Sequence, residues 1–420
     1  MKKKFITSSF LLLVGGVLTK LLGMVIKIVI SNRIGLEGLS LYMLVLPTFS
    51  LLMTVAQAGV PLALSKLVST RDVKPHTLYF TVILSLTVYN IILSIIVLLS
   101  ARFISSNLLH QSNLYLPILA ISFVIPFTTL SSIIRSYFVG TLNMAPPVLS
   151  NLVENIIRFI FVYFFLIYFK NYSTSFIVFI IIIFNIISEG VSCLFLLLFI
   201  PIRKRNYSFD TSYLKDTLKL SIPNLLSSFI GSFTYFLEPI ILLYFSNSSS
   251  INVQYGILTG YVFPILLLPT FFVNAISQAL IPVLTNNIKN KSVTKLLRFI
   301  IINLVLFSIV CSISFIIFGD RLLLFIYHTK YGFNYLRILS IFLFFLYLQP
   351  ICSTIFLSLG KTKYIFYTTL FSSFIRVFTM IIFLILNLEI YSLIYSFIIN
   401  VSFTCLFQIY LIKKEGIILF

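Results

Sequence analysis

Long apolar stretches alternate with short polar segments along the whole chain. An α-helix needs roughly 20 mostly apolar residues to cross about 30 Å of hydrocarbon, and these stretches are long enough. The strands of a membrane barrel would alternate polar and apolar positions, whereas stretches such as Ile177–Asn185 are apolar on every face. The pattern therefore predicts twelve transmembrane helices. Their ranges are Phe5–Ser31, Leu39–Val60, Thr77–Ala101, Leu114–Ile134, Val148–Phe169, Thr174–Phe199, Leu220–Phe245, Val253–Leu280, Leu296–Phe318, Tyr335–Leu359, Tyr364–Asn387 and Ile390–Ile412.

The composition supports the same class. Of the 420 residues, 60% are hydrophobic and 10% are charged, which leaves too little polar surface to coat the core of a water-soluble protein. We therefore expect an all-α integral membrane protein. The basic and apolar amino terminus lacks a small-x-small cleavage pattern, so it is expected to be retained as the first span.

Residue types that commonly carry catalysis or bind metals are scattered along the chain. The three histidines lie in separate loops, and the four cysteines lie inside apolar runs, where a thiol usually packs as a small hydrophobic group. These residues are His76, His110, His328, Cys193, Cys311, Cys352 and Cys405. A G-x-x-x-x-G-K-[ST] phosphate loop is absent from the sequence. We therefore expect a protein that is not an enzyme and uses no metal ion or cofactor.

The distribution of positive charge predicts the orientation in the membrane. Most of the 30 Lys and Arg residues lie in segments on the same side as the amino terminus, and Arg135 is assigned to one of these segments. The opposite segments hold only Arg33, Arg102, Lys170, Arg321, Lys330 and Arg337. By the positive-inside rule, both termini are predicted to be cytoplasmic. This topology, together with contact with anionic membrane lipids, accounts for the net charge of +20 without a nucleic-acid partner.

Short motifs recur in the two halves of the chain, about 220 residues apart. The matching segments are Leu46–Phe49 and Leu268–Phe271, Gln57–Pro61 and Gln278–Pro282, and Ile157–Phe159 and Ile375–Val377. Each match pairs one span with the sixth span after it, so the two copies are parallel. We predict two six-helix lobes, 1–200 and 213–420, joined by a cytoplasmic linker, 201–212. A central cleft between the lobes is the expected substrate site.

Seven ionisable side chains fall inside the predicted spans, where a lipid-facing charge costs about 2.5–3.5 kcal/mol. They are Lys20, Lys27, Glu154, Arg158, Glu189, Glu238 and Arg376. Glu154 and Arg158 are four residues apart, which favours an ion pair on one helix face. Glu189 is interpreted either as a hydrogen-bonded structural residue or as a functional one. Lys27 and Glu238 lie near the outer interface, where long side chains can reach water, so the same choice stays open for them.

The cations among these residues predict an anionic substrate. Lys20 and Lys27 are seven residues apart on one helix face, and their helix contains no acidic residue. Arg158 and Arg376 are at equivalent positions in the repeat, so we expect them to face one cleft from opposite sides. Lys and Arg side chains suit phosphate groups. We therefore predict that Lys20, Lys27, Arg158 and Arg376 bind the substrate, and that Glu154, Glu189 and Glu238 serve in charge pairs or coupling.

Several motifs resemble a known transporter superfamily. The segments Thr19–Lys27 and Asn32–Gly35 resemble the first span of lipid-linked saccharide flippases of the multidrug/oligosaccharidyl-lipid/polysaccharide exporter superfamily. Gln57–Lys66, Tyr255–Gly260 and the pair Glu154 and Arg158 are similar to its stage V sporulation protein B group. The resemblance implies a flippase that moves a prenyl-pyrophosphate-linked saccharide or peptidoglycan precursor from the inner to the outer leaflet. We expect it to work by alternating access, as a monomer in the cell membrane. The resemblance also implies that Lys20 and Lys27 contact the pyrophosphate.

Two other functions fit parts of the sequence. A cation-coupled multidrug antiporter of the same fold would use an acid inside the membrane, for which Glu189 and Glu238 are the candidates. Glu238 could equally couple transport to H⁺ or Na⁺. A membrane-embedded transferase would need several polar residues in the outer segments, but the acids there are only Glu37, Asp320 and Glu389. The sequence therefore favours a transporter.

Overall fold

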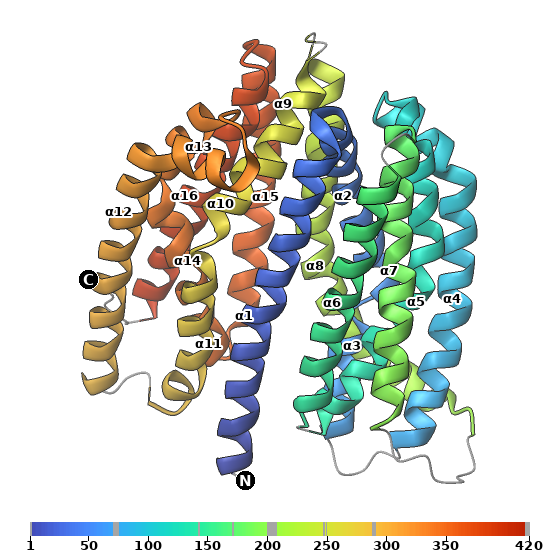
Figure 1. Cartoon of the computed structure of the whole chain (residues 1–420). Helices are drawn as coiled ribbons and strands as arrows, with labels where there is room; N and C mark the ends of the chain where they lie inside the picture. Colours follow the sequence, from blue (N-terminus) through green and yellow to red (C-terminus); the bar gives the residue numbers. More distant parts are fainter. Residues whose placement is uncertain are drawn as a thin grey trace. The chain divides into compact units, whose positions relative to one another are not determined.

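The computed structural model describes residues 2–69, 75–141, 143–169, 172–199, 208–246, 248, 250–287 and 291–415 (Figure 1). Helices fill most of these ranges, and within them the backbone forms no β-strand. The predicted all-α class is confirmed.

Sixteen α-helices and three short helical turns follow one another along the described chain. They are α1 (Lys2–Arg33), α2 (Gly35–Gln57), α3 (Val60–Ser69), α4 (Pro75–Phe103), η1 (Ile104–Leu108), η2 (Ser112–Leu114), α5 (Tyr115–Gly140), α6 (Ala145–Tyr168), α7 (Thr174–Leu197), α8 (Thr211–Phe245), α9 (Ile251–Ile257), η3 (Leu258–Val262), α10 (Phe263–Leu267), α11 (Thr270–Asn287), α12 (Lys291–Tyr327), α13 (Phe333–Ser340), α14 (Leu343–Ser358), α15 (Thr362–Ile385) and α16 (Ile390–Lys414).

The helices account for all twelve predicted spans. Among the described residues, 10 helices are long and apolar enough to cross a membrane, and 12 spans result when each of two bent pairs is taken as one. One pair bends by 51° between Ile251–Leu267 and Thr270–Ser277. Pro269 lies at that break and cannot donate a helical hydrogen bond. The other pair bends by 56° between Phe333–Ser340 and Leu343–Ser358, where no proline lies at the break.

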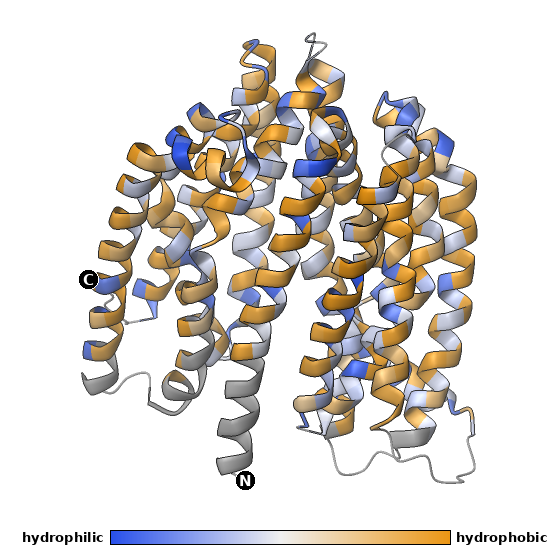
Figure 2. Cartoon of the chain, in the orientation of Figure 1, coloured by the Kyte–Doolittle hydropathy of each residue, from blue (hydrophilic) through white to orange (hydrophobic). Residues whose placement is uncertain are grey.

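The outer surfaces of several helices are apolar along most of their length (Figure 2). Leu99 in α4 is 75% exposed and Phe325 in α12 is 83% exposed. Exposing apolar side chains of this size to water is unfavourable in free energy, whereas the hydrocarbon of a bilayer is a suitable solvent for them. The chain is a multi-pass membrane protein.

The described chain divides into two compact units, Met1–Phe236 and Leu237–Phe420. In the first unit, α5 packs against α3, α4 and α7, while α6 packs against α1 and α7. The division falls within α8, because the first half of this helix packs closely on the turn between α2 and α3. At Gly59 in that turn, an added Cβ would lie 2.6 Å from the Ser221 carbonyl oxygen. Residues 201–207 of the expected linker are outside the described residues, so the lobe boundaries stay a prediction.

The second unit is built around α14 and α16. Helix α16 packs against α15 and α14, and α14 packs against α11 and α12. Polar side chains fasten these contacts: Gln349 Nε2 donates to the Val401 carbonyl at 2.9 Å, and Asn400 Nδ2 donates to the Ser372 carbonyl at 2.7 Å. Such bonds are favourable inside a membrane because lipid offers no alternative partner.

Candidate functional site

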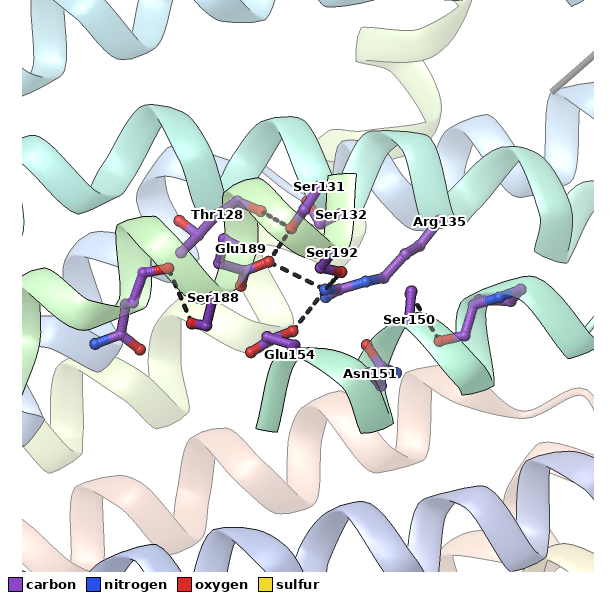
Figure 3. Close-up of polar contacts among 12 residues, drawn as sticks. Thr128, Ser131, Ser132, Arg135, Ser150, Asn151, Glu154, Ser188, Glu189 and Ser192 are labelled. Carbon is purple, nitrogen blue, oxygen red and sulfur yellow. Dashed lines mark hydrogen bonds and ion pairs between the residues drawn. The ribbon is translucent and has the colours of Figure 1, made fainter. Parts of the chain in front are cut away.

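Three helices of the first unit hold a buried network of charged side chains (Figure 3). The Nη2 atom of Arg135 in α5 lies 2.6 Å from Glu154 Oε2 in α6 and 3.0 Å from Glu189 Oε2 in α7. Glu154 and Glu189 are 7% and 6% exposed, and the Arg135 side chain is 19% exposed. Because charges out of water need partners, this single guanidinium stabilises both carboxylates.

The network extends along α6 to Arg158. Its Nη2 atom lies 2.5 Å from Glu154 Oε1, which confirms the predicted pair of residues four apart on one helix face. Glu154 therefore uses one carboxylate oxygen for each arginine. Two arginines and two glutamates balance, so the network carries no net charge.

Small hydroxyl side chains complete the network. The Ser131 hydroxyl in α5 donates to Glu189 Oε2 at 2.5 Å, and Arg135 Nη2 donates to the Ser192 hydroxyl in α7 at 2.8 Å (Figure 3). Serine also lets α5 and α7 approach closely, because its side chain is short. Glu189 is thus a hydrogen-bonded and ion-paired residue.

The depth of the network follows from the helix rise of about 1.5 Å per residue. Arg135 lies about 8 Å from the end of α5, Glu154 about 13 Å from the start of α6, and Glu189 about 12 Å from the end of α7. All three helix ends lie on the side that the charge distribution predicts to be cytoplasmic. In that topology the network occupies the inner half of the bilayer.

The prediction that Arg135 lies in a cytoplasmic segment is wrong. The predicted span ends at Ile134, but α5 continues to Gly140, so Arg135 is a helical and largely buried residue. The signal was present in the sequence: Ser136–Gly140 is still mostly apolar, and Ser131 and Ser132 precede Arg135 by one turn. An arginine followed by a further apolar turn indicates a charge held inside the membrane.

The described part of the second unit contains a buried ion pair. Arg376 Nη2 in α15 lies 2.8 Å from Glu238 Oε1 in α8, and Glu238 is 2% exposed. The Arg376 guanidinium also lies over the ring of Phe397, 5.1 Å from its centre. Glu238 therefore does not extend to water at the outer interface. Arg158 and Arg376 each have a carboxylate partner.

The two lysines of α1 have different surroundings. Lys20 is exposed and Lys27 is half-buried. Helix α1 packs on α6 through a core that includes Ile26, Ile30 and Val162. None of the described carboxylates pairs with Lys27. The substrate-binding roles of Lys20, Lys27, Arg158 and Arg376 stay predictions, and these residues are divided between the two units.

Metal-binding side chains are dispersed in the structure as they are in the sequence. Within the described ranges, no three His, Cys, Asp or Glu side chains come close enough to hold a metal ion. All four cysteines are free thiols. The His76 side chain lies outside the described residues.

Solved structures of transporters share this fold. "Lipid II flippase MurJ, inward closed conformation" aligns with a TM-score of 0.77 at 17% identity, covering 95% of this chain and 87% of that one. An inward-facing multidrug resistance MATE family transporter of the MOP superfamily aligns with a TM-score of 0.74 at 15% identity, covering 95% and 94%. The MATE multidrug transporter DinF-BH gives 0.70 at 17% identity, covering 100% and 97%. The predicted twelve-helix transporter fold is thereby confirmed.

Curated relatives are also similar in sequence. Stage V sporulation protein B of Bacillus subtilis (strain 168) is 29% identical over 314 residues, which is 69% of this chain and 60% of that protein. Sporulation protein YkvU of the same strain is 24% identical over 153 residues, 36% of this chain and 34% of that protein. This chain thus matches less than two thirds of the length of either relative. The model of the family "Polysaccharide biosynthesis protein" matches residues 5–288, and the chain belongs to this family.

Proposed function

We propose that this protein is a flippase that moves a prenyl-pyrophosphate-linked saccharide or peptidoglycan precursor from the inner to the outer leaflet by alternating access. Its family and the fold that it shares with a lipid II flippase support this proposal. The proposed location is the cell membrane, with both termini cytoplasmic, and the protein acts as a monomer among membrane lipids.

The charge of α1 is the observation that supports the proposal most. Lys27 in α1 is half-buried, and none of the described carboxylates forms an ion pair with it. Helix α1 contains two lysines within its apolar length and no acidic residue. The two lie about 10 Å apart along the helix, on one face. They supply positive point charges that suit a pyrophosphate group.

The buried network serves this site by fixing the position of α6, the helix on which α1 packs. Helix α1 packs on α6. Glu154 ties α6 to Arg135 of α5, and Arg135 ties α5 to Glu189 of α7. The prenyl chain stays in the hydrocarbon of the bilayer, so its movement between leaflets carries no desolvation cost. The charged head group passes through the protein. The protein removes the cost of moving that head group through hydrocarbon.

The test measures lipid movement in liposomes. A fluorescent prenyl-pyrophosphate lipid is incorporated with the purified protein, and a membrane-impermeant quencher reports how much probe reaches the outer leaflet. Replacing Lys20 or Lys27 with alanine removes a charged contact worth about 1.5–3 kcal/mol, so we expect the apparent affinity for the lipid to fall about 10-fold or more. The control is Lys414→Ala, an exposed lysine at the end of α16. Undiminished flipping in both α1 variants would remove this site from the proposal.

A multidrug antiporter is the second candidate, because MATE transporters share the fold. Its cationic substrates would need an acid with free charge inside the membrane. Glu189 and Glu238 are both paired with an arginine, so their charge is already compensated. The same liposomes, loaded with a cationic dye, separate the two functions. Dye export without lipid movement would favour the antiporter.

A further inference from the structure

A cavity of about 510 Å³ lies at one end of the second unit. It is formed where α9 and α12 end and where α13 and α16 begin. Figure 1 shows α9 and α13 toward the same end of this unit. The lining residues are Ile257, Asp320, Lys330, Tyr331, Gly332, Phe333, Asn334, Tyr335 and Tyr391. In the proposed topology this end faces the outside of the cell, because α12 starts on the cytoplasmic side.

The turn between α12 and α13 packs closely against α9 and η3. Gly332 has a φ of +86°, and an added Cβ would lie 2.7 Å from Val262 Cγ2 and 2.9 Å from Ile257 Cγ2. Only glycine combines this backbone conformation with such a close approach. The turn therefore has a fixed position, and it places Lys330 and Tyr331 at the edge of the cavity.

Aromatic rings form much of the cavity wall. Tyr335 and Tyr391 pack edge to face, with ring centres 5.6 Å apart and an interplanar angle of 84°. Tyr331 is 56% exposed, so its ring is available to a ligand. Phe333 lines the same space. Rings held in this way offer flat apolar surfaces with hydroxyl groups at their edges.

The polar lining is rich in hydrogen-bonding groups but has no net charge. Asp320 supplies a carboxylate acceptor, Asn334 an amide that both donates and accepts, and Lys330 an ammonium donor. The negative and positive charges cancel, so the lining does not select an anion. A sugar ring matches this combination, because its hydroxyl groups bond to polar side chains while its C–H faces pack on aromatic rings. The volume is in the range of small-molecule sites, about 300–1,000 Å³.

The first unit provides a contrast. A cavity of about 960 Å³ near the end of α4 is lined by Arg102, several hydroxyl groups and the side chains of Leu99, Phe103, Asn107 and Tyr115. Arg102 is the one charged residue in its lining, so that cavity carries a net positive charge. Of these two cavities, the one in the second unit has the neutral lining that is rich in aromatic rings.

We infer that the cavity between α12, α13 and α16 is a saccharide-binding site. This inference rests on the proposed function, for which it names a second contact: the sugar part of the head group is held at the outer end of the second unit. Binding there favours the position of the substrate after it has crossed the membrane.

The chain contains no tryptophan, so one introduced tryptophan reports on its own surroundings. Tyr331→Trp keeps an aromatic ring in the cavity, and its emission is followed while N-acetylglucosamine or glucose is added to the protein in detergent micelles. We expect a saturable change in emission. The matched control is Tyr168→Trp, because Tyr168 is 75% exposed and lies outside this cavity. An identical response in the control, or saturation by inorganic phosphate instead of sugar, would overturn the inference.

Second substitutions in the Tyr331→Trp protein test the polar contacts. Asp320→Ala and Asn334→Ala each remove hydrogen-bonding groups, and we expect sugar affinity to fall about fivefold or more in each. Asn334 is exposed, so its variant serves if Asp320→Ala does not fold. Full sugar affinity in folded variants would contradict the site.

The liposome assay separates failure of this site from failure of the proposed function. If the parent protein flips the prenyl-pyrophosphate lipid but Tyr331→Trp does not respond to sugar, the saccharide site is wrong and the flippase stands. If sugar saturates the reporter but the parent moves no lipid, the site stands and the flippase proposal fails.

Discussion

Glu154 Oε2 lies 2.6 Å from Arg135 Nη2, and through this contact α6 is joined to α5 inside the membrane. The same Nη2 atom reaches Glu189 in α7 at 3.0 Å. One guanidinium therefore connects α5, α6 and α7. Loss of Arg135 removes two of the three ion pairs of the network and leaves Glu189 without an arginine partner among the described residues.

Replacing Arg135 with alanine is expected to destabilise the protein by about 3–5 kcal/mol, because Glu154 loses one partner and Glu189 loses its ion pair, the one that it forms among the described residues. Thermal unfolding in detergent measures the effect. The control is Arg102→Ala, an exposed arginine at the end of α4. Adding Glu189→Gln to Arg135→Ala removes one buried charge and is expected to restore part of the loss. Equal stability of Arg135→Ala and the parent would show that the network contributes nothing.

The ion pair between Glu238 and Arg376 makes a prediction about coupling. Each single alanine variant leaves one charge buried in the second unit without its partner, whereas the double variant leaves none. The double variant is therefore expected to be more stable than the sum of the single effects implies, by roughly 1–3 kcal/mol. The four proteins of this cycle are compared by thermal unfolding.

A pair on the protein surface provides the reference for that cycle. Lys361 and Glu415 form an ion pair, with 41% and 19% of their side chains exposed. Because water screens exposed charges, we expect a smaller coupling for this pair than for the buried one. If the two couplings are equal, burial does not strengthen the contact between Glu238 and Arg376.

The sequence pattern predicts the transmembrane spans well and the ion-pair partners of the buried charges much less well. Hydropathy predicted the twelve spans that result when each bent pair is taken as one, because a helix that crosses the bilayer needs an apolar run of a minimum length. The pair of Glu154 with Arg158 was also predictable, since both residues lie on one turn of a single helix. The partner of Arg376 was not, because Glu238 lies in a different helix that only the folded unit brings near. Hydropathy cannot report which helices become neighbours.

The start of α8 makes a prediction about pH. The Asp210 carboxylate accepts hydrogen bonds from the Ser212 hydroxyl at 2.7 Å and from its backbone N–H at 2.9 Å. These bonds hold the pKa of Asp210 below its usual value of 3.8. Because the pKa is lower in the folded state, the bonds stabilise that state above the unfolded pKa. This stabilisation is lost as the pH falls through the folded value.

Ser212→Ala is therefore expected to be less stable than the parent at pH 6, with the difference shrinking as the pH falls below 3.8. Hydrogen exchange at the first turn of α8 measures the opening of this end directly. The comparison variant is Ser208→Ala, which precedes the helix without bonding to Asp210. A difference that grows on acidification would contradict the assignment of the effect to this carboxylate.

The turn between α2 and α3 offers a test of how α8 is attached to the first unit. Gly59 has a φ of +68°, and a Cβ there would lie 2.6 Å from the Ser221 carbonyl oxygen and 2.9 Å from the Leu225 amide nitrogen. Both neighbours are backbone atoms of α8, which cannot move aside as a flexible side chain can. Gly59→Ala is therefore expected to push α8 away from this turn.

Gly35 provides a matched control, because its φ of +71° carries the same backbone penalty and an added Cβ meets nothing within 4 Å. Gly35→Ala is expected to cost about 1–2 kcal/mol from backbone strain alone. Gly59→Ala introduces both this backbone strain and the steric clash, so its thermal unfolding temperature should fall further. Backbone amides of α8 near Ser221 should also exchange faster. If the two variants lose the same stability, the close approach of α8 to Gly59 is not a contact that holds the unit together.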